Sequence, residues 1–334
     1  MAVVRRFFHS SCFKNNIILD TRSLFKQPNR TCCKRNVHNS NALRNKSNQY
    51  EYDLEILPYS KTRLILRPLA FTLAVSSGCF VAATIAQYET MRANLAQHYE
   101  RGFSHVEKKL FKFRQQMNKW VNAMHPGEKT ASVIIALNVG VFLLWRIPSL
   151  RITMTKWFTA TPLSGLSSPM FLSCFSHIET WHLACNMIVL WSFSPVIHDM
   201  LGREQFLAFY ISGGLCSAYI SHLFKLITSS YVASHGASGC ILGVLAAVCV
   251  ANPDARLAIL FLPFFSFPAS KALIGLVSFD LAGLLFRWGL FDHAAHLGGV
   301  AFGSWYIMFG HKYLWDKRLV LTRKWHEFRQ TFSR

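Results

Sequence analysis

Three short motifs hold polar residues that are suited to acyl-transfer chemistry. Ser238 lies in HGASG, His296 in FDHAAHLGG, and His182 and Asn186 in HIETWHLACNM. A serine between small residues is sterically open, and a histidine can take its proton as general base and return it to a leaving amine. His182 and Asn186 share one helix face, where they could donate hydrogen bonds to an oxyanion, and the backbone N–H groups near Ser238 point toward any developing negative charge. The motifs predict a serine nucleophile with a histidine base.

Each motif stands at the start of an apolar stretch. A membrane-spanning helix needs about 20 mostly apolar residues, and the candidate segments are 69–88, 131–147, 181–197, 206–227, 237–251, 272–286 and 293–309. The motifs begin the third, fifth and seventh of these segments. Alternate membrane helices start on the same side, so we expect the polar groups near one face at similar depth.

The spacing of the segments predicts an all-α, polytopic membrane protein. A polar connector separates the first segment from the other six, which gives a 1+6 organisation. The expected parts are a first span with its connector over 51–130, a six-helix core over 131–311 and a basic tail over 312–334. Proline residues, Pro68 among them, are expected at or outside the helix ends. The apolar stretch 255–267 is too short and proline-broken to be counted as a span. The connector 148–180 is expected to lie in the interface or to dip into the bilayer.

The N-terminal 50 residues have the composition of a mitochondrial transit peptide. They contain ten Lys or Arg and one acid, Asp20, within a chain of net charge +20. They lack the continuous apolar core of a secretory signal. The alternative is a disordered basic tail that touches anionic lipid. Because the positive charge is concentrated at one end, it does not predict nucleic-acid binding.

Small residues are placed where two of these helices could meet. Gly239 and Gly243 follow Ser238, and Gly299 and Gly303 follow His296. Each pair has the small-xxx-small spacing that lets membrane helices pack backbone to backbone. The pattern predicts close approach of the two helices that carry the serine and the histidine.

Three further polar residues could support this pair. Asp280 lies mid-span and could orient a polar partner, select substrate, or make an interior hydrogen bond with a neutralised carboxyl. Asp292 lies four residues before His296 and could bond to it or cap the helix. His293 could support the pair or belong to a metal site built from His177, His182, His293 and His296. No ligating Glu or Cys accompanies the HxxH pair, so we expect no metal there.

The motifs FSHIETWHLACNM, GASG and AHLGG together resemble the signature of rhomboid intramembrane serine proteases, over about residues 131–311. The resemblance implies a Ser238–His296 dyad, with His182, Asn186 and the Ser238 N–H at the oxyanion. It implies a lipid-embedded enzyme that cleaves single-pass transmembrane proteins without metal or cofactor. The transit-like start and extra span resemble the mitochondrial members, which act at the inner membrane on proteins linked to mitophagy and apoptosis.

Two positions depart from the family pattern. Leu242 stands where many bacterial members carry an aromatic residue that packs on the histidine, and the Trp145-Arg146 pair ends a span instead of lying in the first long loop. Two other functions compete with proteolysis. An inactive client-binding relative typically loses Ser or His, and this chain keeps both. A transporter would place ionisable groups along one pathway, whereas here they cluster at one face. The sequence does not decide whether the chain forms a homo-oligomer or joins a larger membrane complex.

Overall fold

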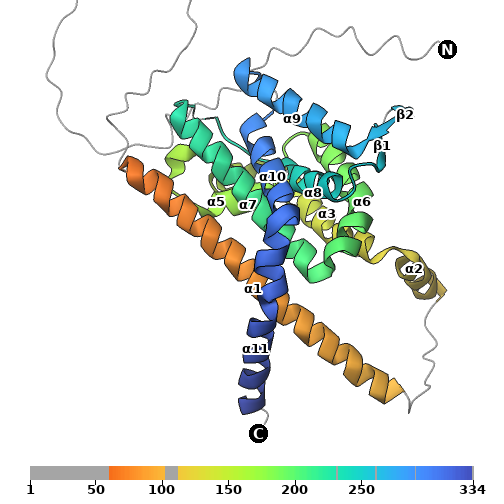
Figure 1. The fold of residues 1–334 in the computed structure, drawn as a ribbon. Helices are drawn as coiled ribbons and strands as arrows, with labels where there is room; N and C mark the ends of the chain where they lie inside the picture. The colour runs from red at the N-terminus through yellow and green to blue at the C-terminus, as the bar shows by residue number, and fades with distance from the viewer. Residues whose placement is uncertain (1–59, 102–111, 231, 260–261, 290, 333–334) are drawn as a thin grey trace, which may run out of the picture. The chain divides into compact units, whose positions relative to one another are not determined.

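The computed structural model describes residues 60–332 apart from 102–111, 231, 260–261 and 290, so the predicted targeting segment lies outside the described residues. The described chain is mostly helical (Figure 1). Its helices are α1 (Lys61–Arg101), α2 (Lys112–Ala123), α3 (Pro126–Leu144), α4 (Arg151–Phe158), α5 (Ser168–Leu172), α6 (Thr180–Leu201), α7 (Arg203–Ile227), α8 (Ser238–Ala251), α9 (Ala269–Leu285), α10 (His293–Trp305) and α11 (Leu319–Phe332). Short 3-10 turns η4 (Pro148–Leu150), η5 (Pro162–Ser164), η6 (Ser173–Phe175) and η8 (Asp316–Arg318) and a π-helical segment η7 (Tyr306–Trp315) complete the helical elements. The prediction of an all-α polytopic protein is confirmed.

Each predicted apolar segment coincides with a helix, the last one continuing from α10 into η7, but the helices differ in length. Four of the described helices, α1, α3, α6 and α7, are long and apolar enough to cross a membrane. The helices α8, α9 and α10 have 14, 17 and 13 residues. At 1.5 Å per residue, α8 is about 21 Å long, shorter than a hydrocarbon core of about 30 Å. Such a helix needs other helices around it, and α8 packs against α6, α7 and α10.

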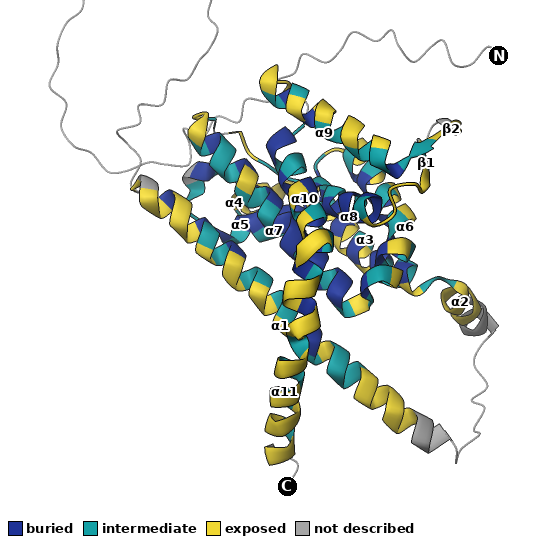
Figure 2. Cartoon of the chain, in the orientation of Figure 1, coloured by how far each residue is buried: buried dark blue, intermediate teal, exposed yellow. Residues whose placement is uncertain are grey.

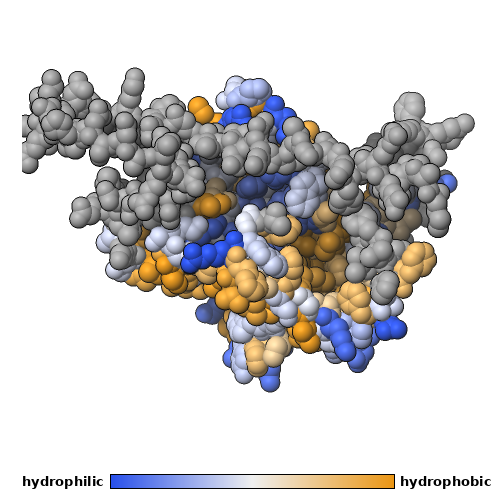
Figure 3. All heavy atoms as spheres, turned by 90° about the horizontal axis from the view of Figure 1, so that it is seen from above, coloured by the Kyte–Doolittle hydropathy of each residue, from blue (hydrophilic) through white to orange (hydrophobic). Residues whose placement is uncertain are grey.

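The hydrophobic core lies around α8. Figure 2 shows buried residues concentrated on α7, α8 and α10, with exposed residues on α11 and along the outer faces. The largest buried side chains are aromatic and include Phe206, Phe209, Tyr210 and Tyr306. Hydrophobic residues lie exposed among hydrophilic ones in the view from above (Figure 3). On α3 and α9, for example, Leu137 and Leu285 are 54% and 76% exposed, which suits a hydrocarbon environment.

The first helix starts earlier than the prolines predicted. Pro68 lies inside α1 instead of before it. A proline within a helix leaves the carbonyl four residues earlier without its usual partner. That carbonyl belongs to Leu64, and the His222 side chain of α7 donates to it from Nε2 at 2.8 Å. This contact with α7 therefore replaces the hydrogen bond that the proline removes.

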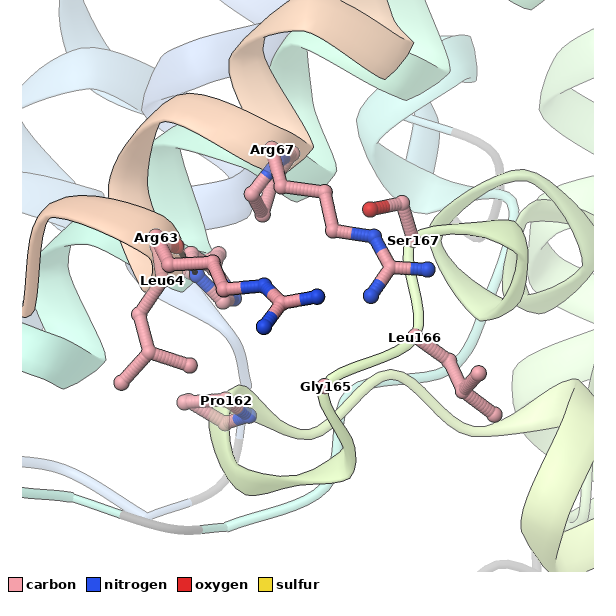
Figure 4. A pocket seen from close by; sticks show the side chains of 9 residues that line it. Arg63, Leu64, Arg67, Pro162, Gly165, Leu166 and Ser167 are labelled. Atoms are coloured by element: carbon pink, nitrogen blue, oxygen red, sulfur yellow. Dashed lines mark hydrogen bonds between the residues drawn. The ribbon is translucent and has the colours of Figure 1, made fainter. Parts of the chain in front are cut away.

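The same end of α1 faces the segment between α4 and α5. Arg63 and Arg67 of α1 lie across a small hollow from Gly165 and Ser167 (Figure 4). The connector 148–180 is therefore folded into short helices and turns instead of an open loop.

Two other segments take more structure than the sequence indicated. The ambiguous stretch 255–267 forms an antiparallel hairpin of β1 (Arg256–Ile259) and β2 (Leu262–Pro268), with Arg256 opposite Pro268 and Leu257 opposite Phe267. The basic tail folds as α11 and packs on α1, where Trp325 Nε1 donates to Glu89 Oε1 at 2.8 Å. The first and last described helices are thereby joined.

Candidate active site

Ser238 and His296 come together at the starts of two packed helices. Ser238 is the first residue of α8, and His296 lies in the first turn of α10. The His296 Nε2 atom is 3.1 Å from Ser238 Oγ. This is hydrogen-bond distance for a histidine that accepts the serine proton.

The glycine pairs allow this approach. A Cβ atom at Gly299 would overlap the carbonyl oxygen of Gly239, and one at Gly303 would overlap the carbonyl oxygen of Gly243. The backbones of α8 and α10 are therefore in direct contact immediately after the Ser238–His296 pair. Any larger side chain at these positions would push the two helices apart.

Asp280 of α9 lies behind the histidine. Its Oδ1 atom is 3.0 Å from His296 Nδ1 and 2.6 Å from His293 Nδ1, and the carboxylate is 1% exposed. A carboxylate oxygen accepts, so Nδ1 of His296 carries its proton and Nε2 is left to accept from Ser238. Of the roles that the sequence left open for Asp280, the geometry favours orientation of a polar partner. His293 shares this carboxylate and fills the space beside Gly283, where a Cβ atom would overlap its ring.

Asp292 is not the acid that faces His296. Its Oδ1 accepts from the Ala295 N–H at 3.0 Å and so caps α10, while Oδ2 receives Lys225 Nζ at 2.9 Å and Ser221 Oγ at 2.6 Å. The alternative of a hydrogen bond to His296 is wrong because capping turns the carboxylate toward the helix end. Burial by itself would raise the pKa of Asp292, but Lys225 and the hydroxyl donors outweigh it and lower the pKa to about 2.

The Asp292 contacts join three segments around the site. Lys225 is at the end of α7, Asp292 begins α10, and Ser234 precedes α8 and contacts both charged groups. The Lys225 side chain is 9% exposed and that of Asp292 is 22% exposed. A buried ion pair of this kind fixes geometry more than it adds net stability. Here it fixes the start of the histidine helix relative to the segment that leads into Ser238.

The predicted oxyanion side contains a histidine that sequence reasoning did not assign to it. His177 Nε2 accepts from Asn186 Nδ2 at 3.0 Å and from the Ala237 N–H at 3.3 Å. Burial lowers the pKa of His177 to about 3, with smaller contributions from His182 and His235, so this ring is a neutral acceptor. His177 thus ties Asn186 to the residue before the serine. In the sequence, the signal for this role of His177 was its position five residues before His182.

His182 lies over the backbone next to the serine. Gly236 has φ of 125°, which favours glycine, and a Cβ atom there would be 2.8 Å from His182 Cε1. The Gly236 N–H also donates to the Ser173 carbonyl at 2.9 Å, which holds the loop in place. The glycine in HGASG therefore allows His182 to reach the start of α8.

At both positions that depart from the family pattern, other contacts in the structure replace the expected ones. The Phe291 ring centroid is 5.9 Å from that of His296, so an aromatic group reaches the histidine from before α10 instead of from position 242. Trp145 and Arg146 follow directly after α3 and still contact the next loop: Trp145 donates to Ser176 Oγ at 2.9 Å, and Arg146 donates to the Ile178 carbonyl at 2.7 Å. Neither contact follows from sequence spacing.

Fold and site together define a class: a polytopic helical membrane protein with a serine–histidine–aspartate constellation at the start of a short central helix. The model of the rhomboid domain family matches residues 165–313. The presenilin-associated rhomboid-like protein, mitochondrial, of Bos taurus and that of Homo sapiens are each 46% identical over 274 residues, which cover 80% of this chain and 72% of each relative. Rhomboid protein 1, mitochondrial, of Saccharomyces cerevisiae is 33% identical over 211 residues, or 60% of this chain and 59% of that protein.

The chain belongs to the rhomboid family. With its apolar helices and mitochondrial relatives, it is a multi-pass mitochondrial membrane protein.

Proposed function

We propose that the chain is an intramembrane serine endopeptidase of the mitochondrial inner membrane. Its substrates are single-pass proteins, cut in or near their transmembrane segments. The observation that carries this proposal is the 3.1 Å contact between Ser238 Oγ and His296 Nε2. Family membership supports it, and a catalytically inactive client-binding protein is the alternative.

Acylation begins with proton transfer from Ser238 to His296. The serine oxygen attacks the peptide carbonyl, and Nε2 takes the hydroxyl proton. Asp280 accepts from Nδ1, which keeps the ring in the correct tautomer and stabilises the imidazolium that forms. His296 then gives the proton to the leaving amine, and a water molecule activated by the same ring hydrolyses the acyl-enzyme.

The oxyanion of the tetrahedral intermediate meets donors on the other side of Ser238. The first N–H groups of α8 have no helical carbonyl partner, and their dipoles favour negative charge. His182 lies against Gly236 beside them. Asn186 uses one amide hydrogen on His177, which leaves its second hydrogen for a ligand. These groups are positioned before substrate arrives, which is what oxyanion stabilisation requires.

The location of the site supports a membrane substrate. Ser238 starts a helix that is enclosed by other apolar helices, so a peptide bond must enter an apolar bundle to be cut. A helical segment that enters must also unwind locally, because its backbone hydrogen bonds shield the scissile carbonyl. Water has to reach the same place as the deacylating nucleophile.

The test combines a substrate-independent label with cleavage. Purified full-length protein in liposomes is treated with a fluorescent fluorophosphonate and, separately, with a tagged single-pass membrane protein. We expect wild type to be labelled and to release product, and Ser238→Ala and His296→Ala to do neither while retaining the wild-type melting temperature. Absence of labelling in folded wild type would support the client-binding alternative, and equal cleavage by Ser238→Ala would refute the assigned nucleophile.

A further inference from the structure

A second group of polar side chains lies at the entrance to the site, outside the Ser238–His296–Asp280 line. Glu179 is the residue before α6, His182 is in its first turn, and His235 precedes α8 by three residues. One ligand-type atom from each residue lies within 4.8 Å of the others. The proposed reaction uses neither Glu179 nor His235.

The distances within this group are slightly longer than those between ligands of a common ion. Glu179 Oε2 is 3.7 Å from His235 Nε2 and 3.9 Å from His182 Nδ1. Both separations are too long for hydrogen bonds. Neighbouring ligands of a tetrahedral zinc ion, with bonds of about 2.0–2.1 Å, are about 3.4 Å apart. Binding of an ion would therefore require the three atoms to move closer together by a few tenths of an ångström or more.

The chemistry of the group also fits. His182 and His235 offer imidazole nitrogens and Glu179 offers a carboxylate oxygen, which are ligand types that zinc takes in proteins. The Nε2 atom of His235 lies 3.7 Å from Glu179 Oε2, beyond hydrogen-bond distance, so ligation through Nε2 breaks no hydrogen bond between these two residues. Glu179 is about half exposed, at 48% of its side chain, and leaves a fourth position open to water.

A similar group elsewhere lacks this fit and serves as a control. His125, His198 and Asp199 also lie within 4.8 Å. However, His125 Nδ1 accepts from the Gly127 N–H, which places the ring proton on Nε2, where it faces Asp199 at 3.2 Å. A metal at this nitrogen would have to displace that proton and disrupt the cap of α3.

We propose that Glu179, His182 and His235 form a binding site for Zn²⁺ or a similar borderline divalent cation, and that occupancy inhibits the enzyme. The ion would join the first turn of α6 to the segment before Ser238, two walls of the entrance. Ligation through Nδ1 would draw the His182 ring away from Gly236 and from the oxyanion. The inhibitory part rests on the proposed protease function, whereas the binding part does not.

Binding is tested with zinc alone on full-length Ser238→Ala protein in detergent micelles, by equilibrium dialysis and metal analysis. We expect one zinc per chain. Glu179→Gln or His235→Gln, added to Ser238→Ala, should weaken binding by more than about tenfold, since even residues behind a metal ligand contribute about 10–100-fold. The matched control His198→Gln should bind as tightly as Ser238→Ala. Unchanged binding in both site variants, or equal loss in the control, would overturn the site.

Inhibition is tested on proteins that keep Ser238. Zinc should lower cleavage by wild type, EDTA should restore it, and zinc should have less effect on His235→Gln, each protein being compared with itself without metal. Cobalt substitution gives a second readout, because tetrahedral Co²⁺ absorbs strongly in the visible range and this signal should disappear in His235→Gln. Zinc binding without any cleavage in wild type would remove the proposed function and leave the site. Cleavage without zinc binding would do the reverse.

Discussion

Replacement of Asp280 by asparagine tests how far the reaction depends on a carboxylate in α9. The Asp280→Asn side chain would keep the size of the original but lose the charge that faces His296 Nδ1 at 3.0 Å. At an effective dielectric constant of about 20, unit charges at this separation attract by about 5 kcal/mol. An imidazolium exists only after Ser238 has lost its proton, so this attraction favours the transition state.

The corresponding loss in kcat is about a thousandfold to ten-thousandfold, because about 1.4 kcal/mol corresponds to a factor of ten. Asparagine also lets the amide donate, which permits the wrong tautomer of His296, and that effect alone is of the order of 10⁴ in serine proteases with an Asp–His–Ser triad. KM should change little because the Asp280 carboxylate lies behind the ring, on the side away from Ser238. Its role is that of a positioning residue.

The assay is single-turnover and steady-state cleavage in proteoliposomes, with fluorophosphonate labelling as a second measure of serine reactivity. Asp292→Asn is the matched control, since it makes the same chemical change at the start of α10 without contact to His296. A folded Asp280→Asn protein with kcat within about tenfold of wild type would show that His296 does not need this carboxylate, contrary to the Coulomb estimate. Equal loss in Asp292→Asn would trace the effect to the start of α10.

Three other outcomes are expected. Gly299→Ala should separate α8 from α10, because its Cβ would overlap the Gly239 carbonyl. This overpacking should cost about 1–3 kcal/mol and lower the melting temperature. Gly275→Ala, where a Cβ meets nothing within 4 Å, should leave the melting temperature unchanged. Lys225→Met should lower the free energy of unfolding by about 3–5 kcal/mol, because it leaves the charged Asp292 without its cation. The double variant Lys225→Met/Asp292→Leu should recover part of this loss in denaturant unfolding. If the losses of the two single variants simply add in the double variant, the two residues are not coupled. The folded-state pKa of Asp292 is lowered from 3.8 to about 2, so its contribution to stability is present above pH 4 and is lost as pH falls toward 2. The melting temperature of wild type should therefore fall more steeply than that of Asp292→Asn over this range. Parallel melting curves for the two proteins would contradict the assigned ion pair.

Much of the site was visible in the sequence because membranes penalise polar groups. Ser238, His296, His182 and Asn186 stand out in apolar segments, and counting of spans placed them near one face. The glycine pairs indicated close helix packing for the same reason, since few side chains other than glycine allow it. Helix ends were less accurate: α1 includes Pro68, whose lost hydrogen bond is replaced through a contact with α7.

The sequence by itself determined the class of protein and the identity of the paired serine and histidine, because apolar length and isolated polar residues are local features. Only the tertiary structure decided which acid serves the histidine. Asp292 is four residues from His296 and Asp280 is sixteen, yet capping of α10 turns Asp292 toward Lys225 while the packing of α9 brings Asp280 to both histidines. His177 and Phe291 likewise reach the site through side-chain direction and helix packing, and sequence separation encodes neither.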